Sequence, residues 1–110
     1  MIVRLWHGWT TPENAAEYER LVAEEVYPEI ANTTGEGYAG YELARRDHDE
    51  RVEYVTITRF DSWEALEVFA GEDYEQAHVP SEARALLTDF DERAHHYEVR
   101  NGDRPSPTSG

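Results

Sequence analysis

Two adjacent histidines stand in the segment DERAHHYEVR, residues 91–100, which is typical of a β-strand. A strand sends neighbouring side chains to opposite faces, so His95 and His96 cannot serve the same site. An imidazole near neutral pH acts as a general base or as a hydrogen-bond donor to a phenolate or enolate. We predict that His96 faces a pocket in such a role and that His95 faces the helices or the sheet rim. The alternative for His96 is a structural histidine, satisfied by Glu98 or by a backbone carbonyl.

The predicted face of His96 also carries aromatic and hydrogen-bonding side chains. We predict Tyr54 as the second catalytic residue, because its hydroxyl would position a substrate hydroxyl. The predicted substrate-binding residues are Arg4, Trp6, Thr56 and Phe60. Trp6 would stack on a flat ring, and Arg4 would hold an anion near the mouth of the pocket. Each residue also has a structural alternative. Tyr54 and Thr56 are types that strands prefer, Trp6 would be a buried interface anchor, and Arg4 would pair with Glu42 or Glu98.

The residue types that are missing exclude several mechanisms. The chain has no cysteine, which excludes disulfides, thiolate nucleophiles and sulfur-ligated metals. All ten basic residues are arginine, so no lysine is present for a Schiff base or a pyridoxal cofactor. There is no G-x-S-x-G elbow, no P-loop and no dinucleotide fingerprint, and the five histidines lack metal-site spacing. We therefore predict no metal and no cofactor.

The charge of the chain limits its partners. Twenty-four acidic residues outweigh ten basic ones, for a net charge of −14 at pH 7. Such a surface repels phosphate backbones and anionic lipids, so we predict no nucleic-acid partner and no membrane association. The N-terminal MIVRLWHGW lacks the apolar run of a signal peptide, and no segment is predicted to span a bilayer. A cytoplasmic protein is the expectation.

Hydrophobic periodicity and turn residues predict one domain over residues 1–100 and a disordered tail over residues 101–110. Strands are predicted at residues 2–9, 38–47, 51–60 and 92–100, and helices at 10–34, 61–71 and 80–91. Thr11 and Pro12 are typical of a helix start, and Pro28 is expected to kink or end the first helix.

This order of elements predicts an α+β, ferredoxin-like βαββαβ fold with a four-stranded antiparallel sheet and helices on one face. The residues predicted to face the helices are Val3, Leu5, Val55, Ile57, Tyr97 and Val99. The opposite, uncovered face would carry Arg4, Trp6, Glu42, Tyr54, Thr56, Thr58, Phe60, His96 and Glu98. Exposed aromatic rings make a poor solvent surface, so we expect this face to pack against a second copy and to line a small-molecule pocket.

The chain resembles the antibiotic biosynthesis monooxygenase domain family of the dimeric α/β-barrel superfamily. The resemblance covers residues 1–100 and depends on MIVRLWHGWT, on VTITRFDSWEALEVFAGEDYE and on the closing FDERAHHYEVR. It implies a homodimer in which two sheets form a barrel. It also implies cofactor-independent monooxygenation of a flat aromatic or phenolic small molecule. Superfamily members differ in activity, so the fold does not select among them.

Two alternatives to a monooxygenase stay open. One is a dimer that binds a small molecule without turning it over. The other is haem binding or degradation through His78, because haem-degrading relatives bind iron with a histidine that closes a segment like YEQAHV. The chain departs from those relatives at Phe69, where they have a catalytic tryptophan, and near His7, where they have an asparagine. Pro80, which follows closely, is a further departure.

Overall fold

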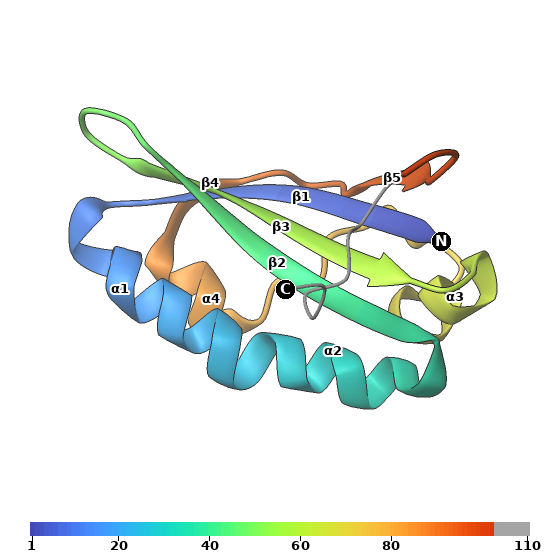
Figure 1. Cartoon of the computed structure of the whole chain (residues 1–110). Coiled ribbons are helices and arrows are strands. Elements are labelled where there is room, and N and C mark those ends of the chain that lie inside the picture. Colours follow the sequence, from blue (N-terminus) through green and yellow to red (C-terminus); the bar gives the residue numbers. More distant parts are fainter. Residues whose placement is uncertain (103–110) are drawn as a thin grey trace, which may run out of the picture.

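The computed structural model describes residues 1–102 as one antiparallel sheet with helices packed on one side (Figure 1). Its strands are β1 (Ile2–Thr10), β2 (Tyr38–Asp47), β3 (Val52–Phe60), β4 (Leu87–Phe90) and β5 (His95–Glu98). Its α-helices are α1 (Pro12–Leu21), α2 (Tyr27–Thr34), α3 (Trp63–Ala70) and α4 (Ser81–Leu86). A π-helical segment, η1 (Val22–Val26), joins α1 to α2, and a 3₁₀ turn, η2 (Gly35–Gly37), follows α2. Most of the predicted tail, residues 103–110, lies outside the described residues.

The sheet order is β2-β3-β1, with β4 and β5 both paired to the free edge of β1. The ferredoxin-like α+β fold class is confirmed, with one change at the end of the chain. The helix predicted at 80–91 ends at Leu86, because Leu87–Phe90 pairs with β1 as a strand instead. The sheet therefore has five strands where four were predicted: β4 lies within the predicted helix, and the predicted closing strand at 92–100 is reduced to β5.

The first helix begins where the sequence predicts. The Thr11 side chain accepts a hydrogen bond from the Asn14 amide, and Pro12 occupies the first helical turn. Pro28 has no amide hydrogen, so a regular helix would leave the carbonyl four residues before it without a donor. The chain responds with the π-helical turn of η1, in which the Tyr27 amide donates to the Val22 carbonyl.

Glycines end two of the helices and allow one close contact. Gly35 follows α2 with φ 76°, and Gly71 follows α3 with φ 81°, a region that side chains rarely adopt. A β-carbon built on Gly37 would lie 2.3 Å from the Ala65 β-carbon, so η2 packs directly on α3 through this glycine.

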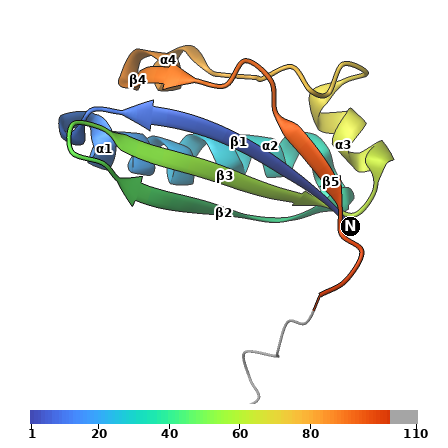
Figure 2. The same ribbon diagram turned by 90° about the horizontal axis from the view of Figure 1, so that it is seen from above.

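The helices cover the face of the sheet that holds the even-numbered residues of β1 and β3 (Figures 1 and 2). The predicted groups of residues do share faces, with one exception, but the prediction of which face is covered was wrong. Arg4, Trp6, Tyr54, Thr56, Thr58, Phe60 and His96 lie on the covered side, and Val3, Leu5, Val55, Ile57, Tyr97 and His95 lie on the uncovered side. The exception is Glu42, which pairs with Ile57 and so lies on the uncovered side.

Two clusters of buried side chains fill the space between sheet and helices. One cluster is centred on α1 and the Val52 end of β3. In the other, Leu66 of α3 packs against Ile2 and Phe60 of the sheet. Each cluster buries mainly aliphatic and aromatic groups, which is the principal source of stability for a domain of this size.

Within residues 1–102 no helix combines the length and apolar character needed to cross a bilayer.

Candidate ligand-binding site

A cavity lies between the covered sheet face and the helices. Its volume is about 70 Å³, and its walls are mostly apolar. The residues that line it are Arg4, Trp6, Tyr18, Val22, Val26, Tyr27, Ile30, Thr56, Thr58, Phe69, Ala77, His78, Val79, Pro80 and Ala83. An outer groove of about 370 Å³ shares Val26, Ile30, Phe69, His78 and Pro80 with the cavity. These shared walls make the groove the mouth of the cavity, and its outer rim carries Glu25, Glu29 and Glu82.

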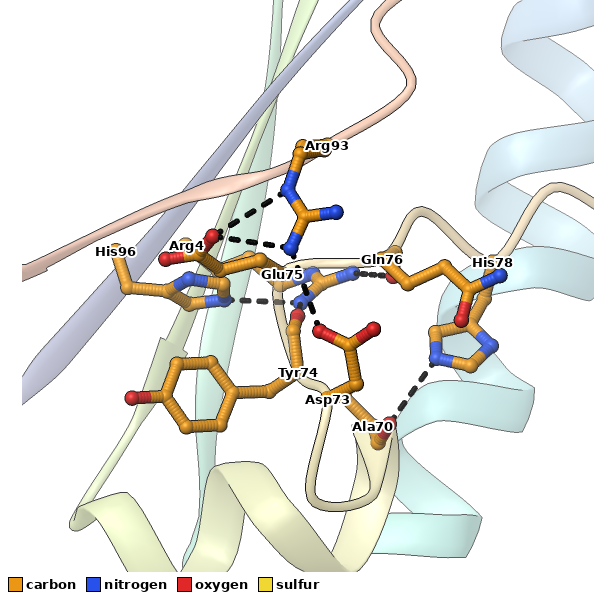
Figure 3. Close-up of polar contacts among 9 residues, drawn as sticks. All are labelled: Arg4, Ala70, Asp73, Tyr74, Glu75, Gln76, His78, Arg93 and His96. Atoms are coloured by element: carbon orange, nitrogen blue, oxygen red, sulfur yellow. Dashed lines mark hydrogen bonds and ion pairs between the residues drawn. The ribbon is translucent and has the colours of Figure 1, made fainter.

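Arg4 brings a positive charge to the cavity wall. It projects from β1 and is only 7% exposed. Its guanidinium donates to the backbone carbonyls of Tyr74 and Gln76 in the 71–80 loop, and Nη1 lies 2.9 Å from His96 Nε2 (Figure 3). Burial lowers the pKa of Arg4 to about 10, which still leaves the group charged at neutral pH.

No carboxylate pairs with Arg4 among residues 1–102. The two acidic residues of the 71–80 loop that flank its acceptor Tyr74, Asp73 and Glu75, pair instead with Arg93 at 3.4 and 3.3 Å (Figure 3). A buried charge is normally compensated by a counter-charge, because its removal from water is costly. The Arg4 guanidinium is therefore a buried charge without a carboxylate partner among residues 1–102.

His96 lies behind Arg4 and does not line the cavity. A guanidinium has no acceptor, so His96 Nε2 must be the acceptor in this contact and the ring proton must sit on Nδ1. Burial, and next the charge of Arg4, lower the pKa of His96 to about 4, so the ring is neutral at neutral pH. Nδ1 is buried and has no hydrogen-bond partner among the described residues.

His78 lines both the cavity and its mouth. Its Nε2 lies 3.2 Å from the Ala70 carbonyl (Figure 3). A carbonyl can only accept, so Nε2 is the donor in this contact. Phe69 contacts His78 edge-on at 5.8 Å between centroids, and the Arg4 guanidinium lies 5.5 Å from the centre of the same ring. The cavity therefore brings a guanidinium and an imidazole to one aromatic ring.

Three hydroxyl groups add hydrogen-bonding capacity to the wall. Thr56 and Thr58 project from β3, and Tyr27 lies opposite them on α2. Burial raises the pKa of Tyr27 above its usual value, so its hydroxyl stays protonated. Burial likewise raises the pKa of Tyr18, a further wall residue, to about 12.

The structure brings together only some of the predicted site residues. Arg4, Trp6, Thr56 and His78 line the cavity, whereas Tyr54, Phe60 and His96 do not. Tyr54 is fully buried in the core, where its hydroxyl donates to the Glu19 carboxylate at 2.6 Å. Phe60 is fully buried and packs at 6.0 Å against Phe69.

Sequence reasoning missed several wall residues. Thr58 had the same strand alternation as Thr56, which was a sufficient signal for it. Tyr27 and the apolar stripe of the first helix gave only the signal of a core-facing helix side, because a cavity wall and a core have the same periodicity. In the sequence, Phe69 stands out only as a departure from the haem-degrading relatives.

Comparison with known proteins supports the fold. No protein-family model and no curated protein matches the sequence. MhuD, a heme-degrader from Mycobacterium tuberculosis, is 20% identical, with a TM-score of 0.61 over 94% of this chain and 100% of that one. A monooxygenase from the gene ActVA-Orf6 of Streptomyces coelicolor, in complex with nanaomycin D, is 16% identical. Its TM-score is 0.58, and the match covers 96% of this chain and 92% of that one.

A third structure is SnoaB, a cofactor-independent oxygenase from Streptomyces nogalater. It is 19% identical, with a TM-score of 0.55 over 92% of this chain and 95% of that one. At these identities the likenesses establish a shared fold. The resemblance to antibiotic biosynthesis monooxygenases is confirmed at that level.

Proposed function

We propose that this protein is a cofactor-independent monooxygenase that binds a flat aromatic hydroxyl compound as its anion. The observation that carries the proposal is the buried Arg4 guanidinium, which faces a largely apolar cavity without a carboxylate partner among residues 1–102. An ionised ring hydroxyl would supply the missing negative charge, and the rings of Trp6 and Phe69 would contact the flat skeleton. The fold shared with a monooxygenase and a cofactor-independent oxygenase supports the same reaction class.

The proposed reaction needs no external reductant. His78 Nδ1 takes the hydroxyl proton, and Arg4 stabilises the resulting anion. The anion passes an electron to O₂, the two radicals combine at a ring carbon that carries hydrogen, and the peroxide loses water. One oxygen atom remains on the ring as a new carbonyl. The other leaves as water with the hydroxyl hydrogen and the ring hydrogen, so a phenol and O₂ give a quinone and H₂O.

The roles proposed here differ from those predicted from the sequence. Proton removal is assigned to His78 rather than His96, because His96 Nε2 accepts from Arg4 and the low pKa of His96 makes it a weak base. Arg4, Trp6 and Thr56 keep their predicted places in substrate binding. Tyr54 and Phe60 support the strand from the core, and their predicted roles remain predictions.

Oxygen uptake by metal-free protein tests the proposal. A panel of acidic phenols, naphthols and hydroxyanthrones would be screened with an oxygen electrode, and products identified as quinones. We expect uptake that depends on substrate, falls by roughly 100-fold in Arg4→Met and is unchanged in Arg20→Met, an exposed arginine on α1. Tight binding of these compounds without any uptake would support the non-catalytic binding protein. If the protein neither binds these compounds nor takes up oxygen with them, both functions are contradicted.

The haem alternative depends on His78, and one observation does not fit it. His78 Nε2 is already engaged by the Ala70 carbonyl. A hemin titration followed by absorbance should give no saturable Soret band; a band lost only in His78→Ala would reverse this assignment.

We also propose that two copies pair through the uncovered sheet face, as the resemblance implies. Val3, Leu5, Val55 and Ile57 make that face aliphatic, and Tyr97 is 56% exposed on it. Burying such a surface against its copy would be favourable. Sedimentation should give twice the chain mass, and Val55→Asp should give the monomer. Val68→Asp, on α3, is the matched control; a monomeric wild type would contradict the dimer.

A further inference from the structure

Two of the five N–H donors of Arg4 have no acceptor among residues 1–102. A guanidinium carries two N–H groups on each terminal nitrogen and one on Nε. Nη1 uses both of its hydrogens, on the Tyr74 carbonyl and on His96 Nε2, and Nη2 uses one on the Gln76 carbonyl (Figure 3). The remaining donors are Nε–H and one Nη2–H. These two nitrogens share one edge of the planar group.

Neutral acceptors hold the guanidinium in place. The Tyr74 and Gln76 carbonyls come from the 71–80 loop, and His96 comes from β5, whose residue 96 pairs with Arg4 in register. A carboxylate at position 96 would satisfy the same hydrogen bond but would also cancel the charge. An imidazole with its lone pair on Nε2 fixes the orientation and leaves the charge available.

We propose that the free edge of Arg4 binds a planar anion side-on through two adjacent oxygens, and that His96 is the positioning residue for this edge. The proposal rests on the proposed function, in which Arg4 contacts an ionised ring hydroxyl. Two parallel N–H···O bonds match the spacing of two oxygens on neighbouring atoms, whereas a lone phenolate oxygen meets only one of them well.

The preferred ligand is therefore an aromatic ring with an ionised hydroxyl next to a carbonyl, as in a hydroxyquinone. An aryl carboxylate also presents two neighbouring oxygens, so the shared chemistry is a pair of coplanar oxygens in an anion, at least one of which carries negative charge. We commit to the ring-bound pair, because the apolar walls of Trp6 and Phe69 would then contact the same ring system that bears the charge.

Three naphthalene probes of similar size separate these cases. The 2-hydroxy-1,4-naphthoquinone anion has two adjacent ring oxygens, 2-naphthoate has a carboxylate, and the 4-cyano-1-naphthol anion has a single oxygen. Binding would be measured by calorimetry at a pH where all three are ionised. We expect the hydroxynaphthoquinone to bind at least about tenfold more tightly than the cyanonaphthol, the value of one further charge-assisted hydrogen bond.

Substitutions at Arg4 and His96 test the two parts of the proposal. Arg4→Lys keeps the positive charge but removes the pair of adjacent N–H donors. The tenfold preference for the hydroxynaphthoquinone should therefore disappear, while some affinity for all three anions remains. His96→Glu places a carboxylate on Arg4 and should weaken all three anions by at least about tenfold, whereas His96→Gln retains an acceptor and should retain the preference. Thermal unfolding confirms that each variant is folded, and Arg20→Met is the control.

The outcomes separate this inference from the proposed function. Equal affinity for one-oxygen and two-oxygen anions, or a preference that survives in Arg4→Lys, would overturn the side-on edge. Wild-type binding by His96→Glu would overturn the role of His96. Unchanged anion binding in Arg4→Met would instead overturn the anion site of the proposed function itself. A preference for 2-naphthoate would uphold the edge and identify an aryl carboxylate as its ligand.

Discussion

Arg4 and Tyr54 are two long polar side chains on the same covered sheet face, and both are almost completely buried. Tyr54 donates its hydroxyl hydrogen to the Glu19 carboxylate, and the Ala15 carbonyl lies 3.3 Å away. Arg4 meets two carbonyls and a neutral imidazole, and keeps both its charge and two donors. A buried polar group whose partners are complete is part of the scaffold, whereas one whose charge is uncompensated points to a missing partner.

The difference has an energetic basis. A neutral hydroxyl needs only one or two hydrogen bonds to offset its burial, and Tyr54 has them. A buried cation needs a counter-charge as well, or it weakens the fold. The domain tolerates this cost at Arg4 next to a cavity, where a ligand can supply the counter-charge on binding.

The largest predicted effect separates binding from stability at Arg4. In Arg4→Met we expect anion affinity to fall by about 100-fold, close to 3 kcal/mol, because the variant loses the only arginine that lines the cavity within residues 1–102. The free energy of unfolding should change by no more than about 1 kcal/mol, because lost hydrogen bonds are offset by relief from burying a charge. Calorimetry and urea denaturation measure the two. A large loss of stability with intact affinity would show that Arg4 belongs to the scaffold.

Tyr54→Phe should show the opposite separation. The variant loses the hydrogen bond to Glu19 and keeps the ring, so we expect a loss of about 1 kcal/mol in the free energy of unfolding. Affinity for the anionic probes and oxygen uptake per folded molecule should stay within about twofold. A much larger loss of uptake than of folded protein would restore the catalytic role predicted for Tyr54 from the sequence.

The smallest predicted effect is a change in pH dependence at His96. Its pKa is about 4 in the folded chain against an ordinary value of 6.5, so the unfolded chain binds more protons between these values. Stability from this group is therefore complete above pH 6.5 and is lost as the pH falls toward 4. In His96→Gln the rise in stability between pH 4 and 6.5 should be shallower than in the wild type. Denaturation midpoints across this range measure it, and identical slopes would contradict the shifted pKa.

Much of the fold could be predicted from the sequence. The Thr11-Pro12 start of the first helix follows from local chemistry. The grouping of Arg4, Trp6 and Thr56 on one face follows from strand alternation alone, as does the separation of His95 from His96. These are short-range rules, and they held.

The long-range choices could not be predicted in the same way. Alternation defines two faces of the sheet but not which one the helices cover. Here the helices cover the more polar face, which lines the cavity. The aliphatic row of Val3, Leu5, Val55 and Ile57 has the pattern of a core face, so alternation alone assigned it to the helices. The contact between Arg4 and His96 joins residues 92 positions apart, and its significance depends on which acids are absent nearby, which no local pattern records.

The π-helical turn at η1 gives the helical region a point at which its length can change by one residue. A turn closed by a hydrogen bond between residues five apart holds one residue more than a regular helical turn for a similar rotation about the axis. Deleting a single residue between Val22 and Val26 would therefore restore a regular turn and leave Tyr27 and Ile30 facing the cavity. In a family of related chains, a one-residue insertion or deletion at this turn would change the cavity wall only near Val22 and Val26, without altering the sheet, Arg4 or His96.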